Sequence, residues 1–229
     1  MESKHRLIAI LAGALLSLQT ATKAAEAEPP ANLNEAQRLV FMNDHLVDVA
    51  SGNVITYDFR RRGKSVEAFS DTVKVNVTAV RDDGRRDLEF DFLTGQNHID
   101  FHPAKAYRGN PVIIHFLERD ILEMSKRTGG DIGYFRNRIR KSFANPEIGS
   151  AKVDVQGRQL DAVEVAVTPF TDDPNVDKFP LYARKRYEFL FAEAIPGGLY
   201  QIHTVVPDGN GADVMIEETM TFRDLSPAD

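Results

Sequence analysis

The sequence predicts a mainly β (α+β) fold: a curved antiparallel half-open β-barrel of about ten strands with a two-helix insertion. Runs with an apolar residue at every second position begin near Val54 and return after residue 150, which is the pattern of half-buried strands. Between them, residues 112–143 carry apolar side chains at helical spacing. Strands and helices do not alternate along the chain, so we expect an antiparallel sheet rather than a parallel βαβ sheet.

The first 24 residues have the three parts of a secretory signal peptide. Residues 4–6 are basic, residues 7–18 form an uncharged apolar run, and small residues follow. The run is shorter than the ~20 residues that a membrane-spanning helix needs. Cleavage is expected after Ala24 or after Ala27, where small residues stand at both recognition positions. We therefore expect a periplasmic protein, with secretion into the medium as the other outcome.

The composition restricts the anchors and partners of the exported chain. The 229 residues contain no Cys, so disulfides and a lipid anchor on a Cys are both excluded. Asp and Glu number 34 against 28 Lys and Arg, which gives a net charge of −6. An acidic chain has no general attraction for nucleic acid, and no nucleic-acid partner is expected.

A short leader and one domain are expected after the signal peptide. Residues 25–33 are rich in Ala, Glu and Pro, which predicts a flexible leader. Residues 34–229 are numerous enough to bury a core as a single half-barrel domain. At its start, Asn34 can cap a short helix, and Glu35 is favourably placed in the first turn of that helix.

Strands are expected in the first part of this domain. Apolar residues alternate at 55–59, 73–77 and 88–92, with turns at 61–63 and 82–84. The Asp83-Gly84 pair between two alternating runs is a strong hairpin signal. A shorter strand is expected at 99–101, ending at Pro103.

Two helices are expected in the middle of the chain. Asn110-Pro111 opens the first, over residues 112–127, with Asn110 as the cap and Pro111 at the first helical position. Gly129 ends it, and Asp131 caps the second, which runs to residue 143. The charged residues expected to lie away from the apolar stripe of the first helix are Glu118, Arg119, Glu123, Lys126 and Arg127.

A second series of strands is expected after the helices. The predicted strands are 153–155, 160–167, 187–191, 199–206 and 214–222, with a Pro- and Asp-rich loop at 169–180. Glu217 and Glu218 are neighbours in the last of these strands. Their side chains are therefore expected to point to opposite faces of the sheet.

The order of these elements resembles that of a known family. A signal peptide, a short helix, a strand meander, a helical insertion and a second meander are also found in the half-barrel carriers of the lipoprotein-localisation (Lol) system, the LolA and LolB type. The resemblance implies a curved sheet around apolar helices that act as a lid over a space for acyl chains. The segments GNPVIIHFLERDILEM (109–124) and GGDIGYFRNRIR (129–140) also resemble blocks of a small family of exported bacterial proteins.

Aromatic strands that face an aromatic-rich helix pair can enclose an apolar ligand. A curved sheet that does not close leaves space that side chains or a ligand must fill. Ordinary core packing is the alternative, because aromatic residues at these spacings usually pack against one another. The residues expected to line the cavity are Tyr57, Phe59, Phe90, Phe92, Ile113, Phe116, Leu117, Ile121, Met124, Phe135, Ile139, Tyr187, Phe189 and Phe191.

His98, Asp100 and His102 form an H-x-D-x-H run. On a strand the three side chains would share one face, and His with a carboxylate suits zinc. A fourth ligand would have to come from elsewhere, with His115 and His203 as candidates. The alternative, which we favour, is the polar outer face of an edge strand, so no metal or other cofactor is expected.

Basic residues are concentrated in the second helix. Arg136, Arg138, Arg140 and Lys141 fall within six positions, and no acidic residue occurs from 132 to 146. Arg136, Arg140 and Lys141 are expected to contact a lipid head group or an acidic partner. A solvated helix face is the alternative.

Enzymatic activity is not expected. The chain has no Gly-x-Ser-x-Gly elbow, no phosphate-binding or dinucleotide motif and no Cys nucleophile. We expect a non-enzymatic protein that binds a hydrophobic ligand or a lipidated protein and makes transient contacts with envelope membrane proteins. The alternatives are a metal-associated binding module built on His98, Asp100 and His102, and a structural or accessory envelope protein without a ligand.

Overall fold

The structure is a computed structural model, and it describes residues 32–228. The expected signal peptide, both cleavage positions and most of the expected leader lie outside the described residues. From Asn32 onward the chain forms one compact unit. None of the helices within this range has both the length and the apolarity that a bilayer crossing requires.

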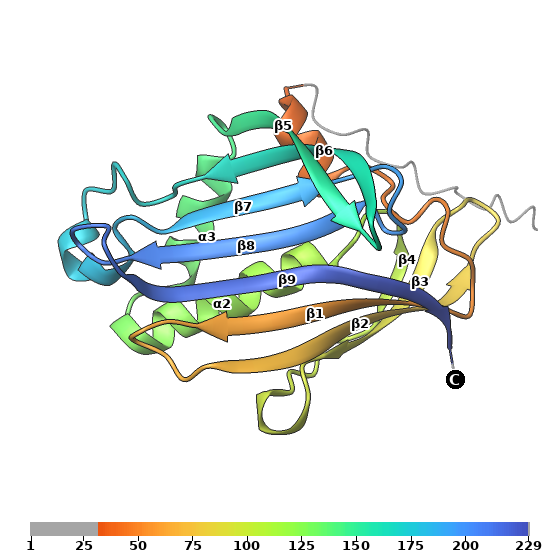
Figure 1. The fold of residues 1–229 in the computed structure, drawn as a ribbon, viewed down its shortest axis with the longest axis horizontal. Coiled ribbons are helices and arrows are strands. Elements are labelled where there is room, and N and C mark those ends of the chain that lie inside the picture. The colour runs from red at the N-terminus through yellow and green to blue at the C-terminus, as the bar shows by residue number, and fades with distance from the viewer. Residues whose placement is uncertain (1–31, 229) are drawn as a thin grey trace, which may run out of the picture. The chain divides into compact units, whose positions relative to one another are not determined.

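Nine antiparallel strands form one curved sheet in the described part of the chain (Figure 1). They are β1 (Asn53–Arg62), β2 (Phe69–Val80), β3 (Arg86–Phe92), β4 (Ala104–Tyr107), β5 (Glu147–Val155), β6 (Arg158–Val167), β7 (Arg186–Phe191), β8 (Leu199–Pro207) and β9 (Val214–Pro227). The order across the sheet is β4-β3-β2-β1-β9-β8-β7-β6-β5. The first strand, β1, pairs with the last, β9, and this pair joins the meander β1–β4 to the meander β5–β9. The predicted half-open barrel is confirmed, with nine strands where about ten were expected.

The period-two pattern places large apolar side chains on the face of the sheet that the helices cover. On β1, Ile55, Tyr57 and Phe59 are fully buried, whereas Arg60 is exposed. The β5–β6 hairpin turns through Gln156 and Gly157, with φ of 53° and 79°. Positive φ at both central residues is what a tight hairpin of this kind requires, and Gly supplies it without steric cost.

Within residues 32–228, three α-helices accompany the sheet, and α2 and α3 lie on one side of it (Figure 1). They are α1 (Glu35–Phe41), α2 (Val112–Thr128) and α3 (Ile132–Ser142), with short 3₁₀ turns at Gly95–Asn97, Val176–Lys178 and Pro180–Tyr182. Asn34 caps α1 by accepting from the Gln37 amide at 2.8 Å, and Asp131 caps α3 in the same way. Both caps were predicted from the sequence, as was the end of α2 at Gly129.

The start of α2 differs slightly from the prediction. The Asn110 side chain accepts from the Val112 amide at 3.2 Å, but Pro111 stands before the helix and not at its first position. Asn110 is buried, and its amide group also donates to the Tyr57 hydroxyl at 2.8 Å and to the Gly197 carbonyl at 3.2 Å. One side chain thus joins the start of α2 to β1 and to the β7–β8 turn.

The strand predicted at 99–101 is wrong. Leu93 has a positive φ of 62° and turns the chain away from β3 into the 3₁₀ turn at Gly95–Asn97. Ile99 keeps a single bridge to Phe92, and the strand β4 begins only after Pro103. Proline has no amide hydrogen to donate to a neighbouring strand, which fits its place before β4 and not within it.

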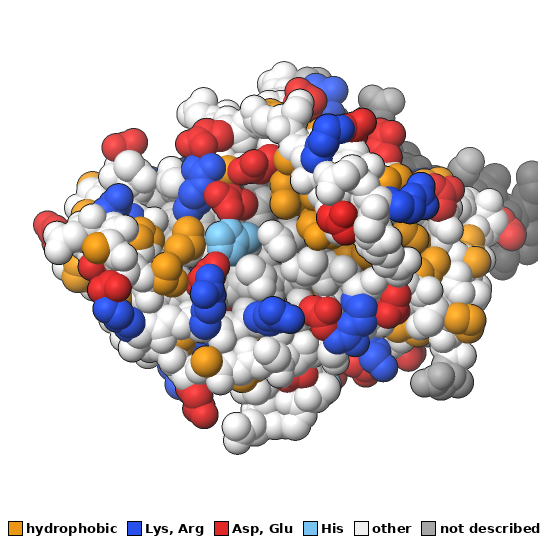
Figure 2. All heavy atoms as spheres, in the orientation of Figure 1, with side chains coloured by type: hydrophobic (Ala, Val, Ile, Leu, Met, Phe, Trp, Pro, Cys, Tyr) orange, Lys and Arg blue, Asp and Glu red, His pale blue; other side chains and the backbone are white. Residues whose placement is uncertain are grey.

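The outer face of the sheet, which the helices do not cover, carries charges of both signs. Figure 2 shows Lys and Arg interspersed with Asp and Glu over this face. The β5–β6 hairpin covers part of it with a small second core, in which Val153, Ala162, Ala192 and Ile195 are buried and Tyr200 packs against them. The main core lies on the inner face, between the sheet and the helices.

Candidate functional site

The fourteen residues expected to line a cavity are all buried in one apolar cluster between the sheet and the helices. Phe59 and Phe116 have their ring centroids 6.3 Å apart, so β1 and α2 are in direct aromatic contact. On the same face, Phe189 of β7 and Phe143, just after α3, have their ring centroids 5.7 Å apart. These contacts are core packing, and contact of the fourteen residues with a ligand stays a prediction.

An apolar groove opens on the helix side, between α2, α3 and the end of α1. Its volume is about 300 Å³. Three residues expected to line a cavity border it: Leu117 and Ile121 from α2, and Ile139 from α3. The complete lining is Phe41, Ile114, Leu117, Glu118, Ile121, Arg136, Ile139, Arg140 and Phe143. The spacing of three or four residues along each helix brings these side chains to one interface.

Two of the three predicted head-group residues lie at this groove. Arg136 donates to both carboxylate oxygens of Glu118, at 2.7 and 2.6 Å, and this ion pair raises the pKa of Arg136. Arg140 also lines the groove, is exposed, and forms no ion pair within the described residues. Lys141 is exposed on α3 but does not line the groove. The groove is therefore apolar inside, with one guanidinium available at its mouth.

Two charged residues of α2, Arg119 and Asp120, are buried toward the sheet, contrary to the prediction that Arg119 lies away from the apolar stripe. Arg119 donates to both oxygens of Glu218 on β9, at 2.8 and 3.1 Å, and both side chains are buried. Asp120 accepts from Lys185 at 2.7 Å and from the Tyr187 hydroxyl. This network joins the buried Arg119, Lys185, Asp120 and Glu218 to the partly buried Arg61 and Glu123, and Arg127 also pairs with Glu123 at its edge.

The network ties the middle of α2, residues 119–123, to β1, to β9 and to Lys185 just before β7. Breaking one partner of a buried ion pair leaves an uncompensated charge, which typically costs about 3–5 kcal/mol. The helix therefore forms a fixed wall of the groove. By comparison, α3 is tied to the loop before β7, because Arg138 pairs with Asp173 at 2.8 Å and donates to the Pro169 carbonyl.

The H-x-D-x-H run does not form a metal site. His98, Asp100 and His102 are exposed and lie outside any strand, so they do not share a face. His203 lies on the outer face of the sheet between Glu188 and Glu217, at 2.7 and 3.1 Å. Among residues 32–228, no three His, Cys, Asp or Glu side chains are grouped so that they could hold a metal ion.

A larger hollow of about 570 Å³ lies between residues 43–48 and the β7–β8 turn at 192–198. Asp44, Asp48 and Glu193 line it, and no Lys or Arg does. His45 closes one side and stacks on Phe191 at 5.2 Å. Its acidic lining does not suit the anionic or apolar ligand that the rest of the chain predicts.

His115 makes the stability of the fold depend on pH. Its ring is stacked on Phe101 at 4.0 Å and lies edge-on to Phe90 at 4.4 Å. Burial lowers the pKa of His115 from 6.5 to about 4, against an opposing effect of Glu118. As the pH falls below 6.5, His115 is therefore protonated in the unfolded chain while it stays neutral in the folded protein. We expect the free energy of unfolding to fall between pH 6.5 and 4, by about 1–2 kcal/mol after allowance for partial solvent screening.

Urea unfolding at several pH values measures this effect. His115→Phe should flatten the dependence between pH 6.5 and 4.5, where carboxylates contribute least. His102→Phe, at an exposed position, is the matched control and should keep the wild-type slope. A residual slope is expected from His45, whose pKa burial also lowers. An unchanged slope in His115→Phe would contradict the assignment.

No protein-family model matches this chain, and neither does any curated protein. Among solved structures, the chain is similar to the lipoprotein LppX of Mycobacterium tuberculosis, at 10% identity and a TM-score of 0.33, over 78% of this chain and 89% of LppX. It is also similar to LprF of Mycobacterium bovis, at 11% identity and a TM-score of 0.34, over 85% of this chain and 95% of LprF. The half-open barrel is established by the nine-stranded sheet of the chain itself.

Proposed function

We propose that this protein is a non-enzymatic periplasmic binding protein for an apolar or lipidated ligand, and that the groove between α2 and α3 holds the apolar part. The observation that carries the proposal is the combination of an apolar lining with a free guanidinium at the mouth. An acyl chain would lie against Leu117, Ile121 and Ile139. An anionic group at its end would accept charge-assisted hydrogen bonds from Arg140.

The size of the groove limits the ligand. Ligand pockets usually have volumes of ~300–1,000 Å³, and this groove, at about 300 Å³, is at the lower limit. It therefore suits one acyl chain and not a complete two-chain lipid. Burial of the acyl chain is favourable by roughly 25 cal/mol for each Å² of apolar surface removed from water.

A structural or accessory role without a ligand is the second candidate. It is favoured by the direct packing of the strand aromatics on the helices, as in the contact of Phe59 with Phe116. Under this alternative the inside of the barrel is filled by its own side chains, and the groove is only a surface depression between two helices.

A charge placed at the groove mouth separates these alternatives. Ile114 lines the groove and is 37% exposed, so Ile114→Glu is expected to leave the core intact. We expect it to weaken binding of the fluorescent fatty acid cis-parinaric acid at least about tenfold. The new carboxylate would lie against the acyl chain of the fatty acid and would repel its carboxylate end.

Leu122→Glu is the matched control, since Leu122 is on the same helix, is 48% exposed and does not line the groove. It should bind the probe as the wild type does. Equal loss in both variants would contradict the groove as the site. Absence of probe binding by the wild-type protein would favour the accessory role.

A further inference from the structure

The charge of the helix pair is opposite to that of the chain. Residues 112–143 carry seven Lys and Arg against four Asp and Glu, whereas the whole chain has 28 against 34. The acidic residues of this segment are mostly occupied in ion pairs. Asp120 pairs with Lys185 in the buried network, and Glu118 pairs with Arg136. The fourth acidic residue, Asp131, is exposed and caps α3. The excess positive charge of the segment is therefore carried by exposed side chains.

Three exposed cations of the helix pair have no acidic partner within residues 32–228: Lys126, Arg140 and Lys141. Two exposed apolar residues, Ile114 and Leu122, are on the same helix pair, with 37% and 48% of their surface accessible. We call these five residues the basic helix face. Apolar side chains among unpaired cations are the arrangement by which proteins bind the interface of an anionic membrane.

We propose that the basic helix face docks on an anionic lipid bilayer. Lys126, Arg140 and Lys141 would lie at the level of the head groups, and Leu122 would enter the acyl boundary. This extends the proposed function, because Ile114 and Arg140 also border the groove. In the docked orientation the groove opens toward the membrane, so an acyl chain passes between the bilayer and the groove without crossing water.

Vesicle co-sedimentation tests this inference with the purified chain. We expect the protein to pellet with vesicles of equal parts phosphatidylglycerol and phosphatidylcholine, and to stay in solution with phosphatidylcholine alone. Each cation near an anionic surface contributes about a fivefold gain in affinity. Lys126→Gln/Lys141→Gln should therefore weaken vesicle binding by roughly twentyfold or more, without touching the groove lining.

Arg60→Gln/Lys74→Gln is the matched control. It removes the same charge from two exposed positions, on β1 and β2, outside the basic helix face. It should bind the anionic vesicles nearly as the wild type does. Equal weakening by the two double variants would overturn the proposal, because the attraction would then follow net charge alone. Pelleting with neutral vesicles to the same extent would overturn it as well.

Two variants separate this inference from the proposed function. Leu122→Ser should reduce vesicle binding severalfold and leave binding of cis-parinaric acid unchanged. Ile114→Glu should weaken probe binding in the groove at least about tenfold while some vesicle binding persists. A wild-type protein that binds the probe but does not pellet with anionic vesicles would overturn docking alone. A wild-type protein that pellets but does not bind the probe would overturn the groove alone.

Discussion

Glu218→Ala is expected to lower the free energy of unfolding by about 3–5 kcal/mol. The Glu218 side chain is 1% exposed and accepts two hydrogen bonds from Arg119, and the Arg61 guanidinium lies 3.3 Å from it. Without this carboxylate, the guanidinium groups of Arg61 and Arg119 keep only Glu123 as an acidic partner, which they share with Arg127. Urea unfolding followed by circular dichroism measures the loss.

The neighbouring position supplies the control. Glu217 is on the same strand but points to the outer face, where it pairs with Arg62, whose side chain is 73% exposed, and with His203. The Glu217 side chain is 14% exposed, but both of its partners are more accessible, so Glu217→Ala should cost less than Glu218→Ala, about 1 kcal/mol. Similar losses in the two variants would show that Glu218 is not in a buried ion pair.

A paired substitution tests the charge balance directly. Arg119→Met/Glu218→Leu removes one cation and one carboxylate, and leaves Arg61 with Glu123. Replacing a buried ion pair by apolar residues of similar volume is often neutral or stabilising. We therefore expect the double variant to recover most of the stability that Glu218→Ala loses. A double variant as unstable as the single one would contradict a balanced network.

The sequence predicts the sheet well because its signals are local. Period two identifies β1, and the same alternation correctly places Glu217 and Glu218 on opposite faces. Helix caps depend on residues three positions apart, and the predicted caps Asn34 and Asp131 are both confirmed. The segment after Leu93 fails because a single non-glycine residue with positive φ redirects the chain, and alternation alone contains no sign of it.

The buried network could not be predicted in the same way. Arg119 and Asp120 follow the apolar Phe116 at helical spacing, which puts them on the side of α2 that meets the sheet. Charged residues at such positions usually lie in solvent, so the sequence pattern favours the wrong face. Their partners Glu218 and Lys185 are 99 and 65 residues away along the chain, and only the fold brings them together.

The groove is an intermediate case. Helical spacing predicts that Leu117, Ile121 and Ile139 are apolar neighbours, and the structure places all three on one groove. Ile114 and Phe41 also line it but could not be assigned to it, since the approach of α1 to the helix pair depends on tertiary packing. Lys141 is separated from Arg140 by one position, about 100° around the helix, which places it outside the groove.

Gly63→Ala is expected to lower the free energy of unfolding by about 3 kcal/mol or more, because the β1–β2 turn lies against the backbone of β9. Gly63 has φ of 140°, a conformation that favours glycine. A Cβ atom there would overlap the Met215 carbonyl oxygen and approach the Met215 carbonyl carbon to 2.6 Å and the Ile216 Cα to 2.9 Å. These are backbone atoms, so no side-chain rotation relieves the contact.

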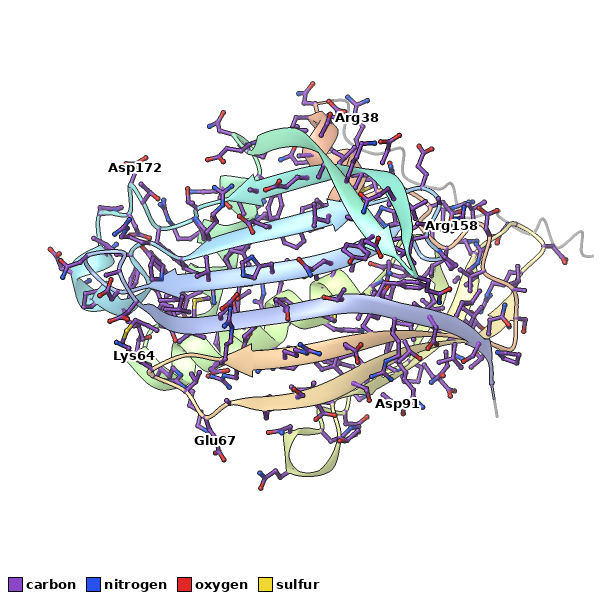
Figure 3. All side chains as sticks on the ribbon, in the orientation of Figure 1. Arg38, Lys64, Glu67, Asp91, Arg158 and Asp172 are labelled. Carbon is purple, nitrogen blue, oxygen red and sulfur yellow. The ribbon has the colours of Figure 1, made fainter. Side chains whose placement is uncertain are left out.

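The two residues that follow Gly63 continue the pairing between β1 and β9. The Lys64 amide donates to the Val214 carbonyl at 3.1 Å, and the Ser65 amide donates to the Met215 carbonyl at 3.0 Å. Figure 3 shows Lys64 at this end of the β1–β2 hairpin. Moving the turn away from β9 breaks these bonds and shifts Arg61, two residues before Gly63, within the buried network. The substitution therefore adds backbone strain and at the same time weakens hydrogen bonding and ion pairing.

Gly84→Ala isolates the backbone contribution. Gly84 also has positive φ, 79°, but an added Cβ would meet no atom within 4 Å. Gly84→Ala should lower the free energy of unfolding by only roughly 1–2 kcal/mol, the cost of placing a non-glycine residue in the left-handed region. The difference between the two variants in urea unfolding measures the close approach of the turn to β9. Equal costs would mean that the turn can move freely, and the position of Arg61 would then not depend on it.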